Sequence, residues 1–358
     1  MKTELSEENR SALGRLPELL LPWFAENARS MPWRETPQPY YTWISEIMLQ
    51  QTRVDAATDY FLRFVRELPA IADLAAVPDE KLMKLWEGLG YYSRAKNLKK
   101  AAEILVAEHD GRLPADYAAL LRLPGIGSYT AGAIASIAFE LPYPAVDGNV
   151  LRVVSRVTAC AADISDTAVK KDWEQEIASI LPEKQIGDFN QSLMELGALI
   201  CVPNGAPHCE RCPLASVCKG RQENRAEDFP VKAPKKERRI EKKTVFLLTC
   251  GGKVALRKRN EQGLLAGMWE FPNAEGHLSA EEAETLLRGQ GLNAVVTKTA
   301  PAKHIFTHVE WQMTGYRAEL AAPPDDPELS WFSLRELEDE ISLPSAFKKY
   351  RQILETML

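Results

Sequence analysis

The sequence pattern changes near residue 230, and this change limits the chain to a fold with two different domains. Through most of 1–230, apolar residues recur at helical spacing. After 243, short β-like runs separated by Gly251 and Gly252 indicate strands and a hairpin. The segment 230–243 is polar, basic and contains proline, which is typical of a linker. We therefore expect a mainly α domain over 1–229, a linker over 230–243 and an α+β domain over 244–358.

The periodicity also predicts individual elements of both domains. In the first domain we expect helices over 16–27, 41–68, 79–87, 95–109, 116–122, 128–139, 149–159, 170–180 and 190–200. In the second we expect strands over 244–249, 253–258 and 311–319, with helices over 281–288 and 334–337.

Composition and charge exclude several classes of protein. Hydrophobic residues make up 45% of the 358 residues and charged residues 26%, which is typical of a soluble globular chain. The apolar stretch 131–139 is too short to span a bilayer, and the polar segment 1–10 is no secretory signal. We therefore expect a cytoplasmic protein that does not bind membranes. The formal net charge of −6 means that a polyanion must be bound by local basic patches and backbone amides.

Four of the six cysteines lie within 18 residues, at Cys201, Cys209, Cys212 and Cys218. In an intracellular chain such clustering indicates metal ligation rather than disulfides. Four thiolates suit either a zinc ion or a [4Fe–4S] cluster, and the spacing alone leaves both open.

A glycine turn between two expected helices provides a candidate phosphate site. It runs Leu123-Pro-Gly-Ile-Gly127, and a helix follows from Ser128. The glycines allow close backbone approach, and the unpaired N–H groups of the next helix favour an anion. We expect Gly125, Gly127 and Ser128 to bind a phosphate group; the alternative is a purely structural turn.

Two acidic residues are candidates for acid and base chemistry. Glu46 lies among apolar residues, where desolvation raises the pKa of a carboxyl and makes it a usable acid. Asp147 opens an expected helix, whose dipole and free amides predict a lowered pKa. The alternatives are a solvated helix glutamate and a simple helix cap.

Aromatic and arginine residues in two turns are candidates for contacts with bases. They are Trp33 with Arg34, and Tyr91 within 90–94. Such side chains stack on bases or wedge between them, although they also serve ordinary core packing.

Together these segments resemble the helix-hairpin-helix DNA glycosylases, and most closely the MutY-type adenine DNA glycosylases. The resemblance is carried by 32–34, 45–52, 86–94, 123–132, 146–150, 195–201, the cysteine cluster and 306–308. It implies a glycosylase domain made of a six-helix module over about 30–140 and an iron–sulfur module over 1–29 and 141–229. It also implies a monomer that acts on double-stranded DNA containing adenine opposite 8-oxoguanine or guanine.

The resemblance implies that the enzyme flips adenine out of the duplex and hydrolyses its N-glycosidic bond. Glu46 is then the general acid, Asp147 the carboxylate that stabilises the sugar cation, and Tyr129 and Asn149 order the site. The remaining implied roles are adenine binding by Trp33, Arg34 and Gln191, substrate binding by Leu49, contacts near 8-oxoguanine by Gln51 and Tyr91, and a [4Fe–4S] cluster held by the four cysteines.

The second domain resembles the Nudix-like domain of the same family. Its acidic segment 279–288 lacks the REUxEE order that binds Mg²⁺ in Nudix hydrolases, so we expect recognition only. By resemblance, the loop Phe306-Thr307-His308 reads 8-oxoguanine.

Two rival functions remain. The related endonuclease III type is also a lyase, and its nucleophilic lysine would fall at Tyr129, so no Schiff base can form there. We therefore expect a monofunctional glycosylase. A lyase acting on oxidised pyrimidines and a non-catalytic damage-binding protein are the alternatives.

Overall fold

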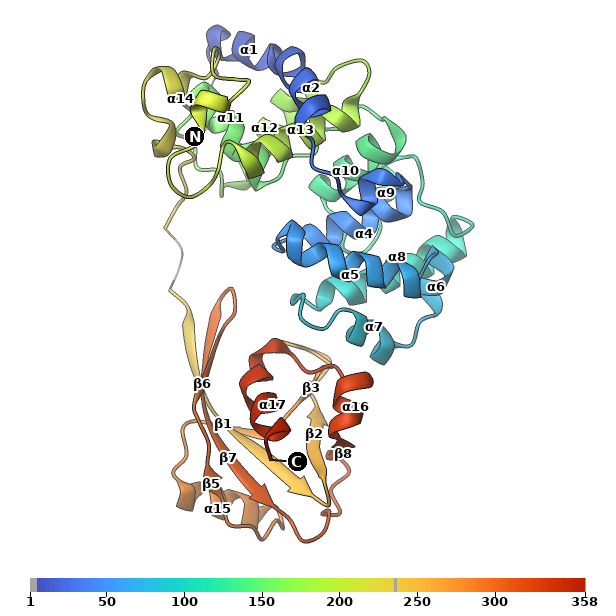
Figure 1. Cartoon of the computed structure of the whole chain (residues 1–358), viewed down its shortest axis with the longest axis vertical. Coiled ribbons are helices and arrows are strands. Elements are labelled where there is room, and N and C mark those ends of the chain that lie inside the picture. The colour runs from blue at the N-terminus through green and yellow to red at the C-terminus, as the bar shows by residue number, and fades with distance from the viewer. Residues whose placement is uncertain (1–4, 235–236, 358) are drawn as a thin grey trace. The chain divides into compact units, whose positions relative to one another are not determined.

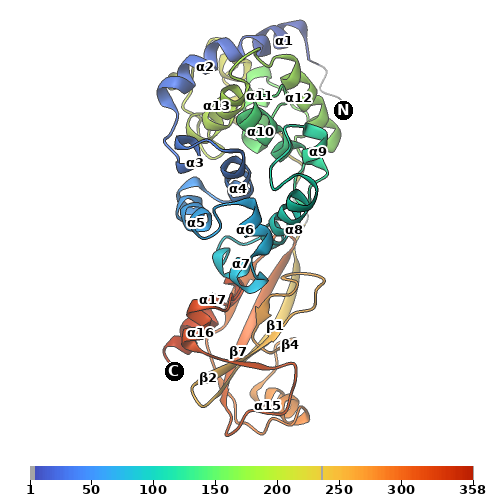
Figure 2. The ribbon, with the colours of Figure 1, turned by 90° about the vertical axis from the view of Figure 1, so that its right-hand side faces the viewer.

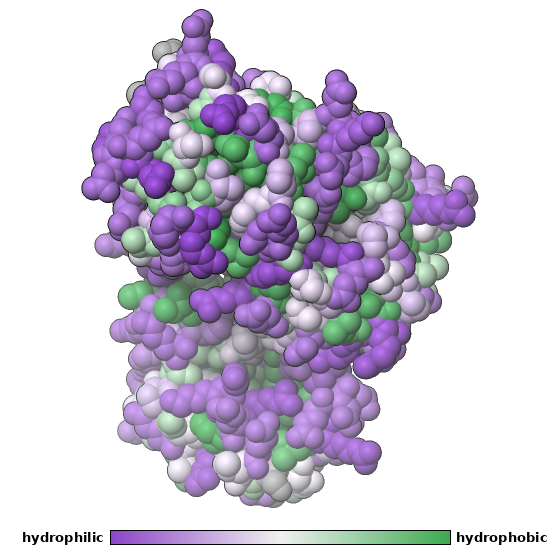
Figure 3. Space-filling view, turned by 45° about the horizontal axis from the view of Figure 1, so that its top comes forward, coloured by the Kyte–Doolittle hydropathy of each residue, from purple (hydrophilic) through white to green (hydrophobic). Residues whose placement is uncertain are grey.

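The computed structural model describes residues 5–234 and 237–357 as two compact units (Figure 1). The helical unit contains 5–76 and 97–234, and the sheet unit contains 77–96 and 237–357. None of the helices in these described ranges is long and apolar enough to cross a membrane. The face shown in Figure 3 is largely hydrophilic, with apolar residues scattered in small groups.

The helical unit is built from short helices that pack their apolar residues against one another. They are α1 (Glu7–Gly14), α2 (Leu16–Asn27), α3 (Pro32–Glu35), α4 (Pro39–Leu49), α5 (Val54–Glu67), α6 (Ile71–Ala76), α8 (Ser93–Glu108, shared with the sheet unit), α9 (Tyr117–Leu121), α10 (Ser128–Phe139), α11 (Gly148–Thr158), α12 (Thr167–Ser179), α13 (Ile186–Leu199) and α14 (Lys219–Gln222). A 3₁₀ turn at Cys209–Arg211 lies between α13 and α14, and a second at Ala226–Asp228 follows α14.

One apolar core of the helical unit joins α1 and α2 to α11, α12 and α13. Its large buried side chains include Trp173, Phe189 and Leu193, and the cysteine segment packs against the same core. A second contact joins α4 to α10, both of which are almost wholly buried. These two packings fix the elements that carry the predicted acidic residues.

The sheet unit contains α7 (Asp79–Leu85) and one mixed sheet. Its later elements are β1 (Arg239–Cys250), β2 (Lys253–Lys258), β3 (Trp269–Glu270), β4 (Asn273–Glu275), α15 (Ala280–Gly289), β5 (Thr297–Lys298), β6 (Ala302–Ile305), β7 (Val309–Glu319), β8 (Ser330–Ser333), α16 (Leu334–Asp339), a 3₁₀ turn (Ser345–Phe347) and α17 (Lys348–Glu355).

The sheet is organised around a long parallel pair. Strands β1 and β7 run parallel from Arg239↔Val309 to Thr249↔Glu319. The main strand order is β3-β2-β1-β7-β5, while β4 pairs with β1, β6 with β7 and β8 with β2. Alternate residues of β1 enter opposite cores: Val245 packs with α16 and α17, and Phe246 with α15. Figure 2 shows these helices on the two sides of the sheet.

Two sequence predictions about elements were wrong. The expected helix 41–68 is two helices, because the chain turns at Gln51, whose φ of 62° interrupts helical geometry. No glycine or proline marks this break. The predicted linker 230–243 is strand from Arg239 onward, since β1 pairs with β7 through backbone bonds that are insensitive to its charged side chains.

The packing also divides the chain differently from the predicted modules. Val77–Lys96 falls within the expected six-helix module 30–140 but packs as part of the sheet unit. The modular domain limits themselves stay a prediction.

Candidate active site

A pocket of about 760 Å³ opens in the helical unit, between α3, α4, α10, α13 and the start of α11. It gathers residues that are far apart in the sequence. The predicted site residues that line it are Trp33, Arg34, Glu46, Leu49, Tyr129, Asp147, Asn149 and Gln191.

Glu46 is a buried acid with a raised pKa. It lies on α4, and only 7% of its surface is exposed. Burial raises the pKa of this carboxyl to about 7, and the nearby Asp147 adds to the rise, while the Tyr129 hydrogen bond and Arg34 oppose it. The Tyr129 hydroxyl donates to Glu46 Oε2 over 2.5 Å. The predicted desolvated environment of Glu46 is therefore confirmed.

Asp147 is the N-cap of α11 and faces the same pocket. Its Oδ1 accepts from the backbone N–H groups of Asn149 and Val150, both over 2.8 Å, and its Oδ2 accepts from Asn149 Nδ2 over 2.7 Å. The predicted lowered pKa was wrong. Withdrawal from bulk water raises the pKa of Asp147, and this effect exceeds the lowering by its hydrogen bonds.

Arg152 connects this cap to the cysteine segment. Its Nη2 donates to Asn149 Oδ1 over 2.8 Å and to the Gly197 carbonyl over 2.7 Å. Its Nε donates to the Cys201 carbonyl over 2.7 Å. Asn149, which orients Asp147, is thus held through Arg152 by the segment where the cysteines begin.

Glu195 is a pocket residue that the sequence interpretation did not assign. It is 2% exposed, and its carboxylate accepts from Arg29 Nε over 2.6 Å and from Arg34 Nη2 over 3.3 Å. These two arginines hold the pKa of Glu195 below its ordinary value despite burial. Arg34 Nε also donates to Gln191 Oε1 over 2.8 Å. Glu195 therefore orients the side chains that face the pocket.

The glycine turn has the expected geometry. Gly125 has a φ of +80°, and a Cβ there would lie 2.8 Å from Asn97 Cβ. Gly127 is the N-cap of α10, so the first amides of α10 are available to an anion. The Ser128 hydroxyl donates to Glu174 Oε1 over 2.7 Å, so a carboxylate already lies beside this helix start.

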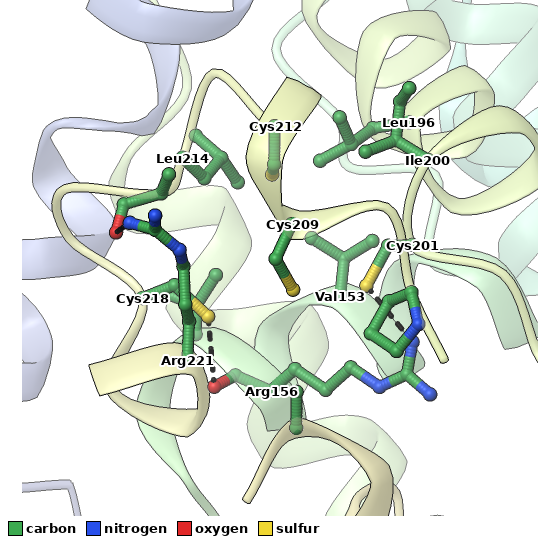
Figure 4. A pocket seen from close by; sticks show the side chains of 14 residues that line it. Val153, Arg156, Leu196, Ile200, Cys201, Cys209, Cys212, Leu214, Cys218 and Arg221 are labelled. Atoms are coloured by element: carbon green, nitrogen blue, oxygen red, sulfur yellow. Dashed lines mark hydrogen bonds between the residues drawn. The ribbon is translucent and has the colours of Figure 1, made fainter. Parts of the chain in front are cut away.

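The four clustered cysteines line one cavity in the helical unit (Figure 4). Its other walls include Val153, Leu196, Ile200 and Leu214. Arg156 Nη1 donates to Cys201 Sγ over 3.2 Å. Burial raises the pKa of Cys212 to about 12, and the neighbouring thiols add to the rise. Within the described ranges, no three His, Cys, Asp or Glu side chains are grouped closely enough to hold one metal ion.

The remaining predicted residues lie outside the pocket. Gln51 is exposed at the turn between α4 and α5. Tyr91 and the loop Phe306–His308 belong to the sheet unit, where the Tyr91 hydroxyl and Thr307 Oγ1 are 3.0 Å apart. Phe306 packs its ring 4.9 Å from that of Trp311, while Thr307 and His308 are exposed.

Two protein families match the two parts of the chain. Residues 44–179 match the HhH-GPD superfamily of base excision DNA repair proteins, and residues 244–352 match the NUDIX domain. A thermostable thymine-DNA glycosylase of known structure superimposes with a TM-score of 0.52 and 27% identity, covering 60% of this chain and 97% of that one. The chain therefore joins a part that matches the helix-hairpin-helix base excision repair superfamily to a part that matches the NUDIX domain.

Curated relatives define the family more closely. Adenine DNA glycosylase of Arabidopsis thaliana is 37% identical over 84% of this chain, which spans about half (53%) of that relative. Adenine DNA glycosylase of Mus musculus is 33% identical over 92% of this chain and 77% of the mouse protein. The chain belongs to the adenine DNA glycosylase family.

Proposed function

We propose that this protein removes adenine from duplex DNA in which adenine lies opposite 8-oxoguanine or guanine. The observation that carries the proposal is the pairing of Glu46 and Asp147 in one pocket of the family fold. A carboxyl with a pKa of about 7 is a usable proton donor at neutral pH. A second carboxylate, fixed by three hydrogen bonds, is suited to a developing positive charge.

The chemistry assigns a separate role to each acidic residue. The adenine enters the pocket after it is flipped out of the duplex. Glu46 gives its proton to adenine N7, and the bond between the sugar C1′ and N9 breaks with its electron pair going to the base. The ionised Asp147 stabilises the cationic sugar, and water then adds to C1′ and releases a proton. The products are free adenine and an abasic site.

Neighbouring residues prepare these groups. Tyr129 keeps the Glu46 carboxyl in place, and Asn149 does the same for Asp147. Arg34 and Gln191 form a connected polar edge for the base, with Trp33 and Leu49 as apolar wall. None of the described residues that line the pocket is a lysine, which supports a monofunctional enzyme over the lyase alternative.

We also propose that Cys201, Cys209, Cys212 and Cys218 hold a [4Fe–4S] cluster. When bound, the cluster provides a structural anchor for this segment rather than hydrolytic chemistry. In a tetrahedral zinc site, Zn–S bonds of about 2.3 Å bring the sulfurs within roughly 4 Å of one another. The four thiols all line one cavity of this segment, which is the arrangement that ligands of a cluster of several atoms need. Broad visible absorption with four irons per chain, lost in Cys212→Ser, is the expected result; stoichiometric zinc contradicts it.

DNA recognition is proposed to use both units. The amides at Gly127 and Ser128, presented by the turn at Gly125, bind a phosphate. Phe306, Thr307 and His308 read the base opposite adenine, with Gln51 and Tyr91 entering the duplex near it. The monomeric state and the cytoplasmic location stay predictions from the sequence.

The direct test is a single-turnover assay on a duplex with adenine opposite 8-oxoguanine. Wild type should give strand breaks only after alkali, without a borohydride-trapped adduct. Glu46→Gln and Asp147→Asn should each lower the rate by about 10²–10⁴-fold, the range of a lost acid or base. Glu108→Gln, at an exposed position, is the matched control. Undiminished adenine release from both pocket variants would overturn the proposal.

A further inference from the structure

Several polar contacts attach the segment Val77–Lys96 to the rest of the sheet unit, through Glu80, Lys84, Glu87, Tyr91 and Lys96. The family match 44–179 includes this segment, yet its packing places it with the strands and helices of the second half of the chain. The attachments are polar and specific, and they lie along the segment from α7 to the start of α8.

The central attachment joins α7 to the end of α16. Lys84 Nζ donates to the carbonyls of Leu337 and Ile341 over 2.9 and 3.2 Å. The Leu337 carbonyl lies in the last turn of α16, where a cation is favourable because a helix leaves its last C=O groups unpaired and partly negative. The side chain of Lys84 is 19% exposed, so water only partly screens the interaction.

Glu87 completes this attachment. Its Oε2 accepts from Lys84 Nζ over 2.8 Å, and its Oε1 accepts from the Leu343 backbone N–H over 2.9 Å. Arg351 Nη1, on α17, lies 3.4 Å from the same Oε1. Glu87, which follows α7, therefore joins this segment to the loop after α16 and to α17.

The two ends of the segment are also held. Glu80 forms an ion pair with Lys258 over 2.7 Å and accepts from Trp269 Nε1 over 3.2 Å. Lys96 Nζ donates to the Ala266 carbonyl over 2.9 Å. These contacts fix the segment before and after its central turn.

The turn between these anchors carries Tyr91 in a constrained backbone. Gly88, Gly90 and Tyr91 have φ values of 100°, 68° and 46°. Arg94 Nη2 donates to the carbonyls of Leu89 and Gly90, both over 3.1 Å. Tyr91 is 48% exposed, and its hydroxyl meets Thr307 Oγ1. A hydrogen bond between two exposed side chains persists only where both backbones are already ordered.

We propose that Val77–Lys96 and the sheet unit act as one reader of the base opposite the excised adenine. In this reader Lys84 and Glu87 are positioning residues that keep Tyr91 in register with Thr307. The proposal rests on the proposed function. On this proposal, the preference for 8-oxoguanine over guanine opposite adenine depends on Lys84 and Glu87, although neither residue contacts the base or lines the adenine pocket.

The test compares single-turnover adenine release from duplexes with 8-oxoguanine or guanine opposite adenine, using the full chain. Glu87→Gln should lower the ratio of the two rates by about tenfold, a usual size for coupling between sites. Lys84→Met should do the same, and Lys84→Arg, which keeps the cation, should restore the ratio. Thr307→Val should lower the ratio of the two rates to a similar extent. The double variant with Glu87→Gln should lower it little further, because both changes act on the contact between Tyr91 and Thr307.

Glu340→Gln is the matched control, because this exposed glutamate lies just after α16. It should leave both rates unchanged. A ratio that stays within about twofold of wild type in Glu87→Gln and Lys84→Met would overturn the proposal. An equal fall on both duplexes would overturn it as well, since it would indicate a general loss of structure.

A binding measurement separates this proposal from the proposed function. Fluorescence anisotropy with duplexes that carry an uncleavable adenine analogue measures the binding preference for 8-oxoguanine over guanine when no base is released. If wild type binds the 8-oxoguanine duplex more tightly but releases no adenine, the proposed function is wrong. The binding preference of Glu87→Gln then still tests the reader proposal. If that variant retains the full binding preference, the reader proposal fails.

Discussion

The helical unit and the sheet unit each bury a glutamate, and the two are stabilised in opposite ways. Glu46 in the helical unit is 7% exposed and has a tyrosine hydroxyl as its hydrogen-bond donor. Glu270 in the sheet unit is 3% exposed and forms ion pairs with Arg257, over 3.0 Å, and with Arg259. Burial is nearly equal, so the partners determine what each carboxyl can do.

This difference distinguishes a structural carboxylate from a reactive one. Two guanidinium groups hold the pKa of the buried Glu195 below its ordinary value and fix its carboxylate beside the pocket. The Tyr129 hydroxyl and the more distant Arg34 offset the desolvation of Glu46 only in part, so the pKa of Glu46 rises to about 7. A buried glutamate without a close ion pair, inside a pocket, is therefore the better indicator of acid catalysis.

The largest effect on stability is expected at the paired glutamates. Glu195→Gln and Glu270→Gln each leave two arginines without their counter-charge, so each should lower the free energy of unfolding by about 3 kcal/mol. Urea unfolding at pH 7 measures this change. The exposed Glu108→Gln is the control and should change little.

The pH dependence sharpens this expectation for Glu195. The pKa of Glu195 is lower in the folded protein than in the unfolded chain. Its ion pairs therefore add to the free energy of unfolding above the ordinary glutamate pKa, and this contribution is lost as the pH falls through the lowered value. The difference between wild type and Glu195→Gln should therefore shrink in acid. A difference that grows as the pH falls would contradict the ion-pair account.

Glu46 should respond in the opposite direction. Its raised pKa means that, at pH 8, the folded state holds a carboxylate that burial disfavours. Glu46→Gln should therefore increase the free energy of unfolding at pH 8 by about 3 kcal/mol, given 1.36 kcal/mol per pKa unit. This increase in the free energy of unfolding should disappear below the ordinary glutamate pKa, where the Glu46 carboxyl of wild type is protonated in both the folded and the unfolded state. A lower free energy of unfolding for Glu46→Gln than for wild type at pH 8 would contradict the proposed difference between Glu46 and Glu270.

The smallest effect concerns Glu174, a partly exposed glutamate that faces the proposed phosphate site. It accepts from Ser128 at the start of α10, where it competes with an anion. Glu174→Gln should tighten binding to undamaged duplex by about two- to threefold, as removal of one repulsive surface charge does. Anisotropy at several salt concentrations measures this change. Unchanged affinity would indicate that phosphate does not approach this turn.

Much of the fold was predictable because local signals coincide with the final structure. The predicted helices 16–27 and 128–139 match α2 and α10 residue for residue. The break at Gln51 was not predictable, since no glycine or proline stands there and tertiary packing imposes the turn. The start of β1 at Arg239 was missed because its pairing with β7 depends on residues 70 positions later.

The candidate site was predictable only in its residue types. An apolar neighbourhood signalled Glu46, and a position at a helix start signalled Asp147, but their shared pocket arises from packing between distant helices. Glu195 was missed because its partner Arg29 lies 166 residues away. Its only sequence signal is an acidic residue at an otherwise buried position of α13. The pKa of Asp147 was misjudged because local capping says nothing of the pocket walls that exclude water.

The central claim is that Glu46 donates a proton from a carboxyl that is neutral near physiological pH. The most direct test is the pH dependence of single-turnover adenine release between pH 5 and 9. The account predicts a rate that falls about tenfold per pH unit above roughly pH 7, as the acid loses its proton. In Glu46→Gln this decline should be absent from the residual rate. A wild-type rate that stays level up to pH 9 would contradict the account.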